Sequence, residues 1–135
     1  MISGIQTVCE WLEQSGTTLY GLIGLRVYKA RLYPGFTNAS AAVLVMLKSG
    51  KSHAHAPVYT GEYEIYCFGG TADQDDAESV FNALKDALHA QSGSMTTGGI
   101  VYAELTGTQV KSVGDSQTGY PVYVARYTIS TTANG

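Results

Sequence analysis

The sequence predicts an α+β fold, in which a mostly antiparallel sheet of four to five strands carries two helices on one face. Two segments have apolar residues at helical spacing, and five are rich in β-branched and aromatic residues. The predicted order is helix, three strands, helix, two strands, and short links between strands favour antiparallel pairing. The chain has 135 residues without an internal repeat, so we expect 1–135 to form a single domain.

The first helix is predicted within residues 3–16. Ser3 and Gln6 have the spacing of a capping box, and Gly16 is a suitable stop. One face of this helix would be buried and would consist of Ile5, Val8, Cys9 and Leu12.

Three strands are predicted next, at residues 25–33, 41–47 and 62–68. The second is apolar at every position, which is typical of a central strand covered on both faces. The third alternates and would bury Tyr63, Ile65 and Cys67. Residues 48–61 between them lack such a pattern, so we expect a long hairpin loop there.

The second helix is predicted from about residue 72 to residue 91. Thr71 and Gln74 form a second possible capping box, and the acidic first turn suits the positive end of the helix dipole. Its buried stripe would consist of Ala77, Val80, Phe81, Leu84 and Leu88. Two further strands follow, at 100–113 and 120–130, and we expect a flexible tail at 131–135.

The charges are few and segregated along the chain. Only 14% of residues are charged, which favours a surface partly covered by partners. The cations before Gly61 are Arg26, Lys29, Arg31, Lys48 and Lys51. From residue 62 to residue 86 the balance inverts: the acids are Glu62, Glu64, Asp73, Asp75, Asp76, Glu78 and Asp86, against Lys85 alone. The two blocks could steer unlike faces of identical subunits together; alternatively, folding interleaves them.

Several patterns were tested as sites of chemistry. His53 and His55 have no carboxylate or cysteine nearby to complete a metal shell. The turn at 69–71 lacks the lysine of a P-loop, and the aspartates after it would repel a phosphate. No nucleophile motif is present. We therefore expect no enzyme activity, no catalytic or metal site and no cofactor.

Two further patterns bear on partners and compartment. Arg26, Lys29 and Arg31 could form a nucleic-acid platform with neighbouring tyrosines, but strand alternation divides them between two faces. Cys9 and Cys67 lie in apolar patterns typical of buried thiols in a reducing compartment.

No membrane span or signal peptide is recognisable, so we expect cytosolic synthesis.

Nearly the whole chain resembles the tail completion, or tail terminator, proteins of long-tailed bacteriophages. The resemblance lies in the order of LRVYKARLYPG, AAVLVML, EIYCFGGTADQDDAESVFNALKDAL, GIVYAELTG and TGYPVYVARYTIS. Its most telling parts are an aromatic strand ending in Cys67-Phe68-Gly69, the alanine- and leucine-rich helix after it, and the TGYP entry to the last strand.

The resemblance implies a non-enzymatic structural protein of the virion neck. It would be made in the host cytoplasm and form a ring, most simply a hexamer, that caps the tail tube and ends its polymerisation. Its partners would be copies of itself, the tail tube protein and a head-side neck or connector protein. Genomic DNA would pass through the lumen without sequence-specific binding, and no membrane would be involved.

The surface expected to contact neighbouring subunits or the tube combines the charged segments with the loop at 48–61. Its residues are Arg26, Lys29, Arg31, Lys48, Lys51, His53, His55, Tyr59, Glu62, Glu64, Asp73, Asp75, Asp76 and Glu78. Alternatives are another neck component, such as an adaptor or head-closure protein, and a small nucleic-acid-binding or enzymatic accessory protein.

Overall fold

Three helices and six strands make up the described part of the chain. The computed structural model describes residues 5–14, 17–29, 41–52, 58–70, 74–89, 92–94, 98–111 and 122–133. The helices are α1 (Ile5–Leu12), α2 (Thr18–Ile23) and α3 (Gln74–Leu88). The strands are β1 (Val27–Lys29), β2 (Ala42–Ser52), β3 (Val58–Phe68), β4 (Gly93–Ser94), β5 (Gly98–Lys111) and β6 (Val122–Ala133).

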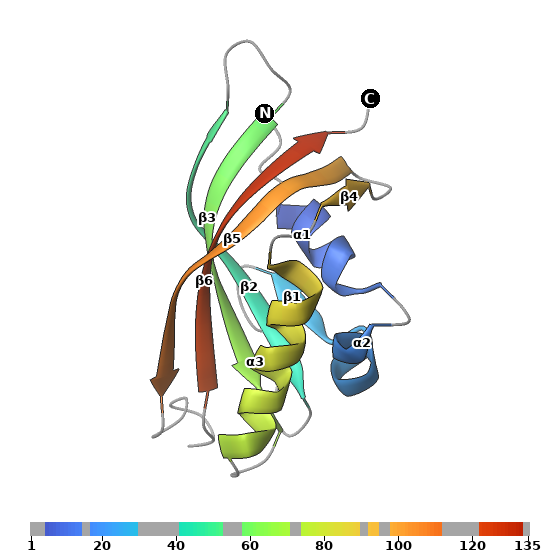
Figure 1. Ribbon diagram of the computed structural model, residues 1–135, viewed down its shortest axis with the longest axis vertical. Helices are drawn as coiled ribbons and strands as arrows, with labels where there is room; N and C mark the ends of the chain where they lie inside the picture. The colour runs from blue at the N-terminus through green and yellow to red at the C-terminus, as the bar shows by residue number, and fades with distance from the viewer. Residues whose placement is uncertain are drawn as a thin grey trace.

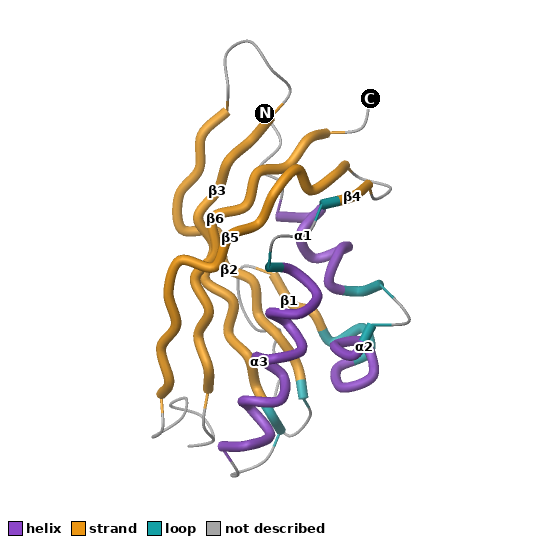
Figure 2. Tube along the Cα trace, in the orientation of Figure 1, coloured by secondary structure: helices purple, strands orange, loops and turns teal. Residues whose placement is uncertain are grey.

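The helices and the sheet form two layers. All three helices lie on one side of a strongly twisted sheet (Figure 1), and no helix of the described residues covers the other side (Figure 2). We call the side away from these helices the outer face. The predicted α+β class is thus confirmed, with one short helix, α2, and one two-residue strand, β4, beyond those predicted.

The strands follow the order β1-β2-β3-β6-β5-β4. Every neighbouring pair is antiparallel except β1 and β2, which are parallel. Parallel neighbours need a crossover of a dozen residues or more, and residues 30–41 are long enough to supply it. The expected mostly antiparallel sheet is therefore confirmed, with one parallel pair at this edge.

The N-terminal helices bury short apolar patterns. Val8, Cys9 and Leu12 of α1 are buried, as predicted. The shorter α2 was missed because only Leu19 and Ile23 mark its buried side. Its ends are well defined: the Thr17 hydroxyl accepts a hydrogen bond from the Tyr20 N–H, and Gly24 ends the helix at a φ of 58°.

The long helix α3 packs against the centre of the sheet. Its buried side includes Ala77, Val80, Leu84 and Leu88, in agreement with the predicted stripe. Phe81 is only partly buried, and its ring stacks on that of Tyr123, with centroids 5.5 Å apart. Trp11 of α1 donates a 2.8 Å hydrogen bond from Nε1 to the Ala87 carbonyl, which fixes α1 beside the end of α3.

The predicted loop at 48–61 is wrong for most of its length. β2 continues to Ser52 and β3 begins at Val58, so only residues 53–57 lie outside the description. The two strands extend past the helices at the top of Figure 1. This β2–β3 hairpin lacks a continuous apolar pattern because its end projects beyond the helical layer.

The last strand also differs from its prediction. β6 continues to Ala133, although a tail was expected from Thr131. Thr131 is 2% exposed and donates a hydrogen bond from Oγ1 to the Tyr59 carbonyl at 3.4 Å. Small polar residues resemble a frayed end in sequence, but here they pair with the projecting hairpin through β3.

Candidate functional site

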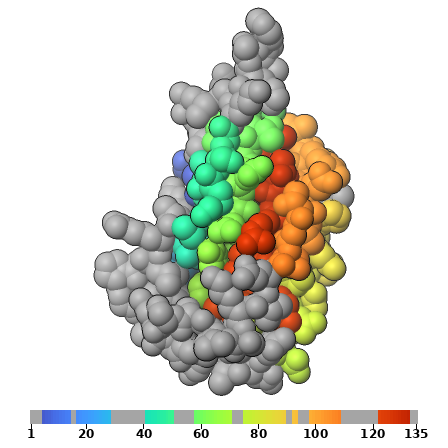
Figure 3. All heavy atoms as spheres, turned by 90° about the vertical axis from the view of Figure 1, so that its left-hand side faces the viewer, coloured from blue at the N-terminus to red at the C-terminus, as the bar shows by residue number. Residues whose placement is uncertain are grey.

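The outer face presents rows of side chains that the strand register brings together. Figure 3 looks onto this face, where β2, β3, β6 and β5 follow one another in teal, green, red and orange. Residues directly opposite each other in antiparallel strands point to the same face. The pairs Glu64↔Arg126, Glu62↔Thr128 and Thr60↔Ser130 therefore form a polar band across β3 and β6.

Glu64 is the centre of this polar band. The Nε atom of Arg126 lies 3.2 Å from its Oε2, and the Nζ atom of Lys48 lies 3.6 Å from its Oε1. The Tyr66 hydroxyl donates a hydrogen bond to the same Oε1 at 3.3 Å. The Glu64 side chain is 16% exposed, whereas those of Lys48 and Arg126 are 51% and 45% exposed. One shielded carboxylate is thus held between two cations that solvent still reaches.

The titration of this group follows from its surroundings. Partial burial would raise the pKa of Glu64, but the hydrogen bond from Arg126, the charge of Lys48 and the hydrogen bond from Tyr66 outweigh it and lower the pKa. Burial, followed by the adjacent negative charge of Glu64, raises the pKa of Tyr66. Glu64 therefore stays ionised and Tyr66 neutral at physiological pH.

The rest of the polar band contains two side-chain hydrogen bonds, one of them to a second acid, Glu62. Ser49 donates a hydrogen bond from Oγ to Glu62 Oε2 at 3.2 Å. The hydroxyl oxygens of Thr60 and Ser130 are 2.9 Å apart. These contacts tie three strands together through side chains that are partly buried or exposed.

The other end of the outer face is apolar. A second buried cluster there consists of Leu44, Phe68, Val122 and Val124, with Tyr28, Met46 and Tyr66 packed against it. It is separate from the main core between the sheet and the helices. The outer face therefore changes from apolar to polar toward the projecting hairpin.

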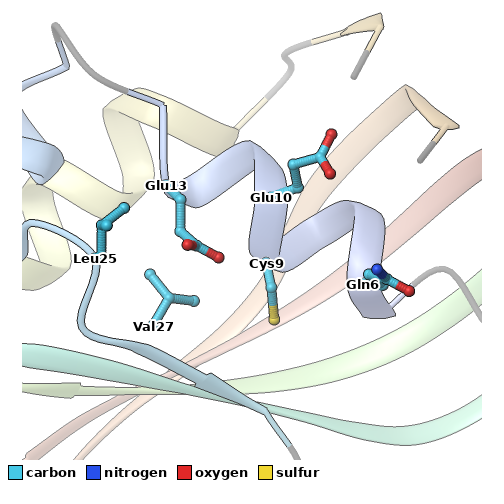
Figure 4. Close-up of a pocket in the computed structure, with 6 residues that line it drawn as sticks. All are labelled: Gln6, Cys9, Glu10, Glu13, Leu25 and Val27. Atoms are coloured by element: carbon cyan, nitrogen blue, oxygen red, sulfur yellow. The ribbon is translucent and has the colours of Figure 1, made fainter. Parts of the chain in front are cut away.

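A groove lies on the helix side of the molecule, between α1 and the β1 edge of the sheet (Figure 4). It has a volume of about 510 Å³ and is lined by Gln6, Cys9, Glu10, Glu13, Leu25 and Val27. Leu25 is 65% exposed although it is a large apolar residue. Burial, followed by the charge of Glu10, raises the pKa of Glu13.

The predicted interface residues are distributed over several surfaces. Lys48, Glu62 and Glu64 meet on the outer face, and the Lys48–Glu64 pair shows that folding interleaves the two charge blocks there. Asp75 and Asp76 occupy the first turn of α3, where they suit the helix dipole, and Glu78 is exposed on the same helix.

Two predicted interface residues have structural roles inside the subunit. Arg26 donates hydrogen bonds to the Ala41 carbonyl at 2.7 Å and to the Leu22 carbonyl at 3.2 Å, so its guanidinium holds the chain next to β1. Tyr59 is only 7% exposed, and its ring covers Gly50 on the neighbouring strand.

The remaining predicted residues are placed only in part. Lys29 and Lys51 lie at the ends of β1 and β2, and their side chains are outside the description. Arg31, His53, His55 and Asp73 lie outside the described residues. The sequence reasoning missed Arg126, which is 62 residues from Glu64, and the groove, whose residues come from separate segments.

The glycine turn after β3 has a structural explanation. A Cβ atom on Gly69 would overlap the backbone of α3 at Asp76 and Ala77, and Gly70 has a φ of 82°. Both glycines are therefore needed for the close approach of strand and helix.

The thiols are also accounted for by packing. Cys9 and Cys67 are thiols and are buried, as predicted, and burial raises the pKa of Cys67. The described residues contain no group of three His, Cys, Asp or Glu side chains arranged to hold a metal ion. None of the described helices has the length and apolar character needed to cross a membrane.

Comparison with known proteins gives a likeness in fold alone. No protein-family model matches the sequence, and no curated protein matches it. Among solved structures, a chain of the virion of a native gene transfer agent (GTA) particle is similar, with a TM-score of 0.64 and 16% sequence identity. The likeness covers 96% of this chain and 95% of that chain. The complete fold is therefore shared with a chain of that particle.

Proposed function

We propose that this protein is a structural component of a virion, and that it forms a ring that caps the tail tube and joins the tail to the head. The observation that carries the proposal is the likeness in fold to a chain of a gene transfer agent virion over nearly the full length of both chains. The sequence resemblance to tail terminator proteins supports the finer assignment to the end of the tail.

The surfaces of the subunit are suited to assembly rather than to chemistry. The polar band of the outer face has Glu62 and two half-exposed cations available around a fixed Glu64 carboxylate. The β2–β3 hairpin projects beyond the helices and offers a contact that reaches another molecule (Figure 1). Polar faces and projecting hairpins give area and orientation to protein contacts.

The functional test is tail assembly with and without the protein. Lysates of cells that produce the particle but lack this protein should contain unjoined heads and tail tubes of irregular length. Adding the purified protein should restore joining, and electron microscopy should place it between tube and neck. Uniform tails joined to heads in its absence would contradict the proposal, and a position against the portal would assign it to another neck component.

A further inference from the structure

Four large apolar side chains are exposed in the described part of the chain, and they form two pairs at different edges of the sheet. Leu22 and Leu25, 37% and 65% exposed, flank the turn from α2 to β1. Val101 and Tyr102, each 48% exposed, lie near the start of β5. β1 is one edge of the sheet, and only the two-residue β4 lies beyond β5 at the other.

Different surfaces at opposite edges of the sheet favour head-to-tail association of identical subunits. Contacts between different surfaces of identical subunits join them head to tail, and they close into a ring when the rotation permits. Exposed apolar residues are common singly, and these two pairs are the places where a second copy would bury the most apolar surface of the described residues. Each edge of this sheet therefore has an apolar pair that a second copy could cover.

The groove between α1 and β1 has the chemistry to receive one particular kind of side chain. Leu25, Val27 and Cys9 supply apolar walls, whereas Glu10 and Glu13 supply carboxylates that accept hydrogen bonds (Figure 4). A fitting side chain has an apolar body and a hydrogen-bond donor at its tip. Tyrosine has this combination, and it is enriched in protein interfaces for the same reason.

Tyr102 of a second copy is suited to enter this groove. It is opposite Ser130 in the register, so it belongs to the outer face, and a bulge between Ile100 and Tyr102 displaces Val101 beside it. Glu13 is partly shielded from water and lies near the negative charge of Glu10, and both effects raise its pKa. A donor hydroxyl would relieve that repulsion by hydrogen bonding to the carboxylate.

We propose that copies of this chain associate head to tail, with Val101 and Tyr102 of one copy seated in the groove between α1 and β1 of the next. In the ring of the proposed function, this contact would be the interface between neighbouring subunits. Its biological role therefore rests on that function. It is a claim about two surfaces, however, and can be tested with the purified protein alone.

Cysteine cross-linking tests the pairing directly. On a Cys9→Ala background, which removes the thiol from the groove, Gln6→Cys in the groove and Val101→Cys beside Tyr102 are made as separate proteins, so that Leu25 and Tyr102 themselves are kept. Under mild oxidation, a mixture of the two should form a disulfide-linked dimer much faster than either protein alone. The control replaces Val101→Cys with Thr108→Cys, an exposed position further along β5. Cross-linking of the Val101 mixture at or below the rate of this control overturns the proposal.

Self-association measured by sedimentation supplies the second test. Tyr102→Phe keeps the ring and loses the donor, so we expect the dissociation constant to rise roughly tenfold. Tyr102→Glu places a third carboxylate in the groove, and we expect a rise of roughly a hundredfold, whereas Thr108→Glu should change little. Equal effects of Glu at 102 and 108 would overturn the proposal.

The two proposals fail in different ways. If cross-linking is specific but particles without the protein have uniform, joined tails, the contact stands and the proposed function falls. If the protein is needed for tail joining but the Tyr102 variants assemble as well as the wild type, the function stands and this contact falls.

Discussion

The Nε atom of Arg126 lies 3.2 Å from Oε2 of Glu64, although 62 residues separate them in the chain. The contact joins β6 to β3 at the centre of the outer face. Lys48 approaches the other oxygen of the same carboxylate from β2. One acid thus links three neighbouring strands where the sheet leaves the helical layer.

We expect Glu64→Gln to reduce the free energy of unfolding by about 1 kcal/mol at pH 7, because both cationic partners are about half exposed. The pKa of Glu64 is lowered in the folded protein from its ordinary value of 4.5. Its stabilisation is therefore present above pH 4.5 and is lost as the pH falls through the lower folded pKa. Urea denaturation of both proteins between pH 3 and pH 7 measures this difference. A constant difference over that range would contradict the assignment.

Much of the fold was predictable because its signals are local. The α3 stripe and the alternation of Tyr63, Ile65 and Cys67 each lie within one segment that packs on the core, and both are confirmed. The parallel pairing of β1 with β2 was not predictable in this way, since no local pattern in either strand sets their relative direction.

The candidate site was less predictable than the fold. Lys48 and Glu64 were identified by their charge, but Arg126 enters the site only through the register of β6 on β3. Tyr59 was expected at an interface because it falls in the predicted loop at 48–61, but it lies within β3 and is buried. In the fold its ring uses the space that Gly50 leaves on the neighbouring strand.

The hydroxyl of Tyr127 is buried and has no hydrogen-bond partner among the described residues. An unsatisfied buried hydroxyl is unfavourable, so we expect Tyr127→Phe to raise the free energy of unfolding by up to about 1 kcal/mol. Tyr127→Leu is the control, since it also removes the ring and should cost about 2 to 4 kcal/mol. Chemical denaturation measures both variants. A clear loss of stability in Tyr127→Phe would show that the hydroxyl has a partner in solution.

The close packing of Tyr59 on Gly50 gives a test of the hairpin geometry. A Cβ atom at position 50 would overlap the Tyr59 ring, so Gly50→Ala should destabilise the protein by about 1 to 3 kcal/mol. Gly21→Ala is the matched control, because nothing lies within 4 Å of its Cβ position in α2. There alanine should stabilise by up to about 1 kcal/mol through helix propensity. If Gly50→Ala remains equally harmful when Tyr59 is also changed to Ala, the overlap is not the cause.

The end of the β2–β3 hairpin can be removed without disturbing its last described pair, Ser52↔Tyr59. We replace residues 53–58 by Asn-Gly, which favours a two-residue hairpin turn. The free energy of unfolding should fall by no more than about 1 kcal/mol, because only the terminal Val58↔Thr132 pair is lost and the core lies elsewhere.

Under the proposed function, the shortened protein should nevertheless fail to cap tubes. We expect irregular tail lengths and few joined heads when it replaces the wild type in the assembly assay described above. The control keeps the length of the loop and replaces 53–57 with glycine and serine, which separates the reach of the hairpin from its chemistry. If only the shortened protein fails, the hairpin acts through its reach, and if both fail, the side chains at its end make the contact. Normal tails from the shortened protein would remove the hairpin from the proposed mechanism.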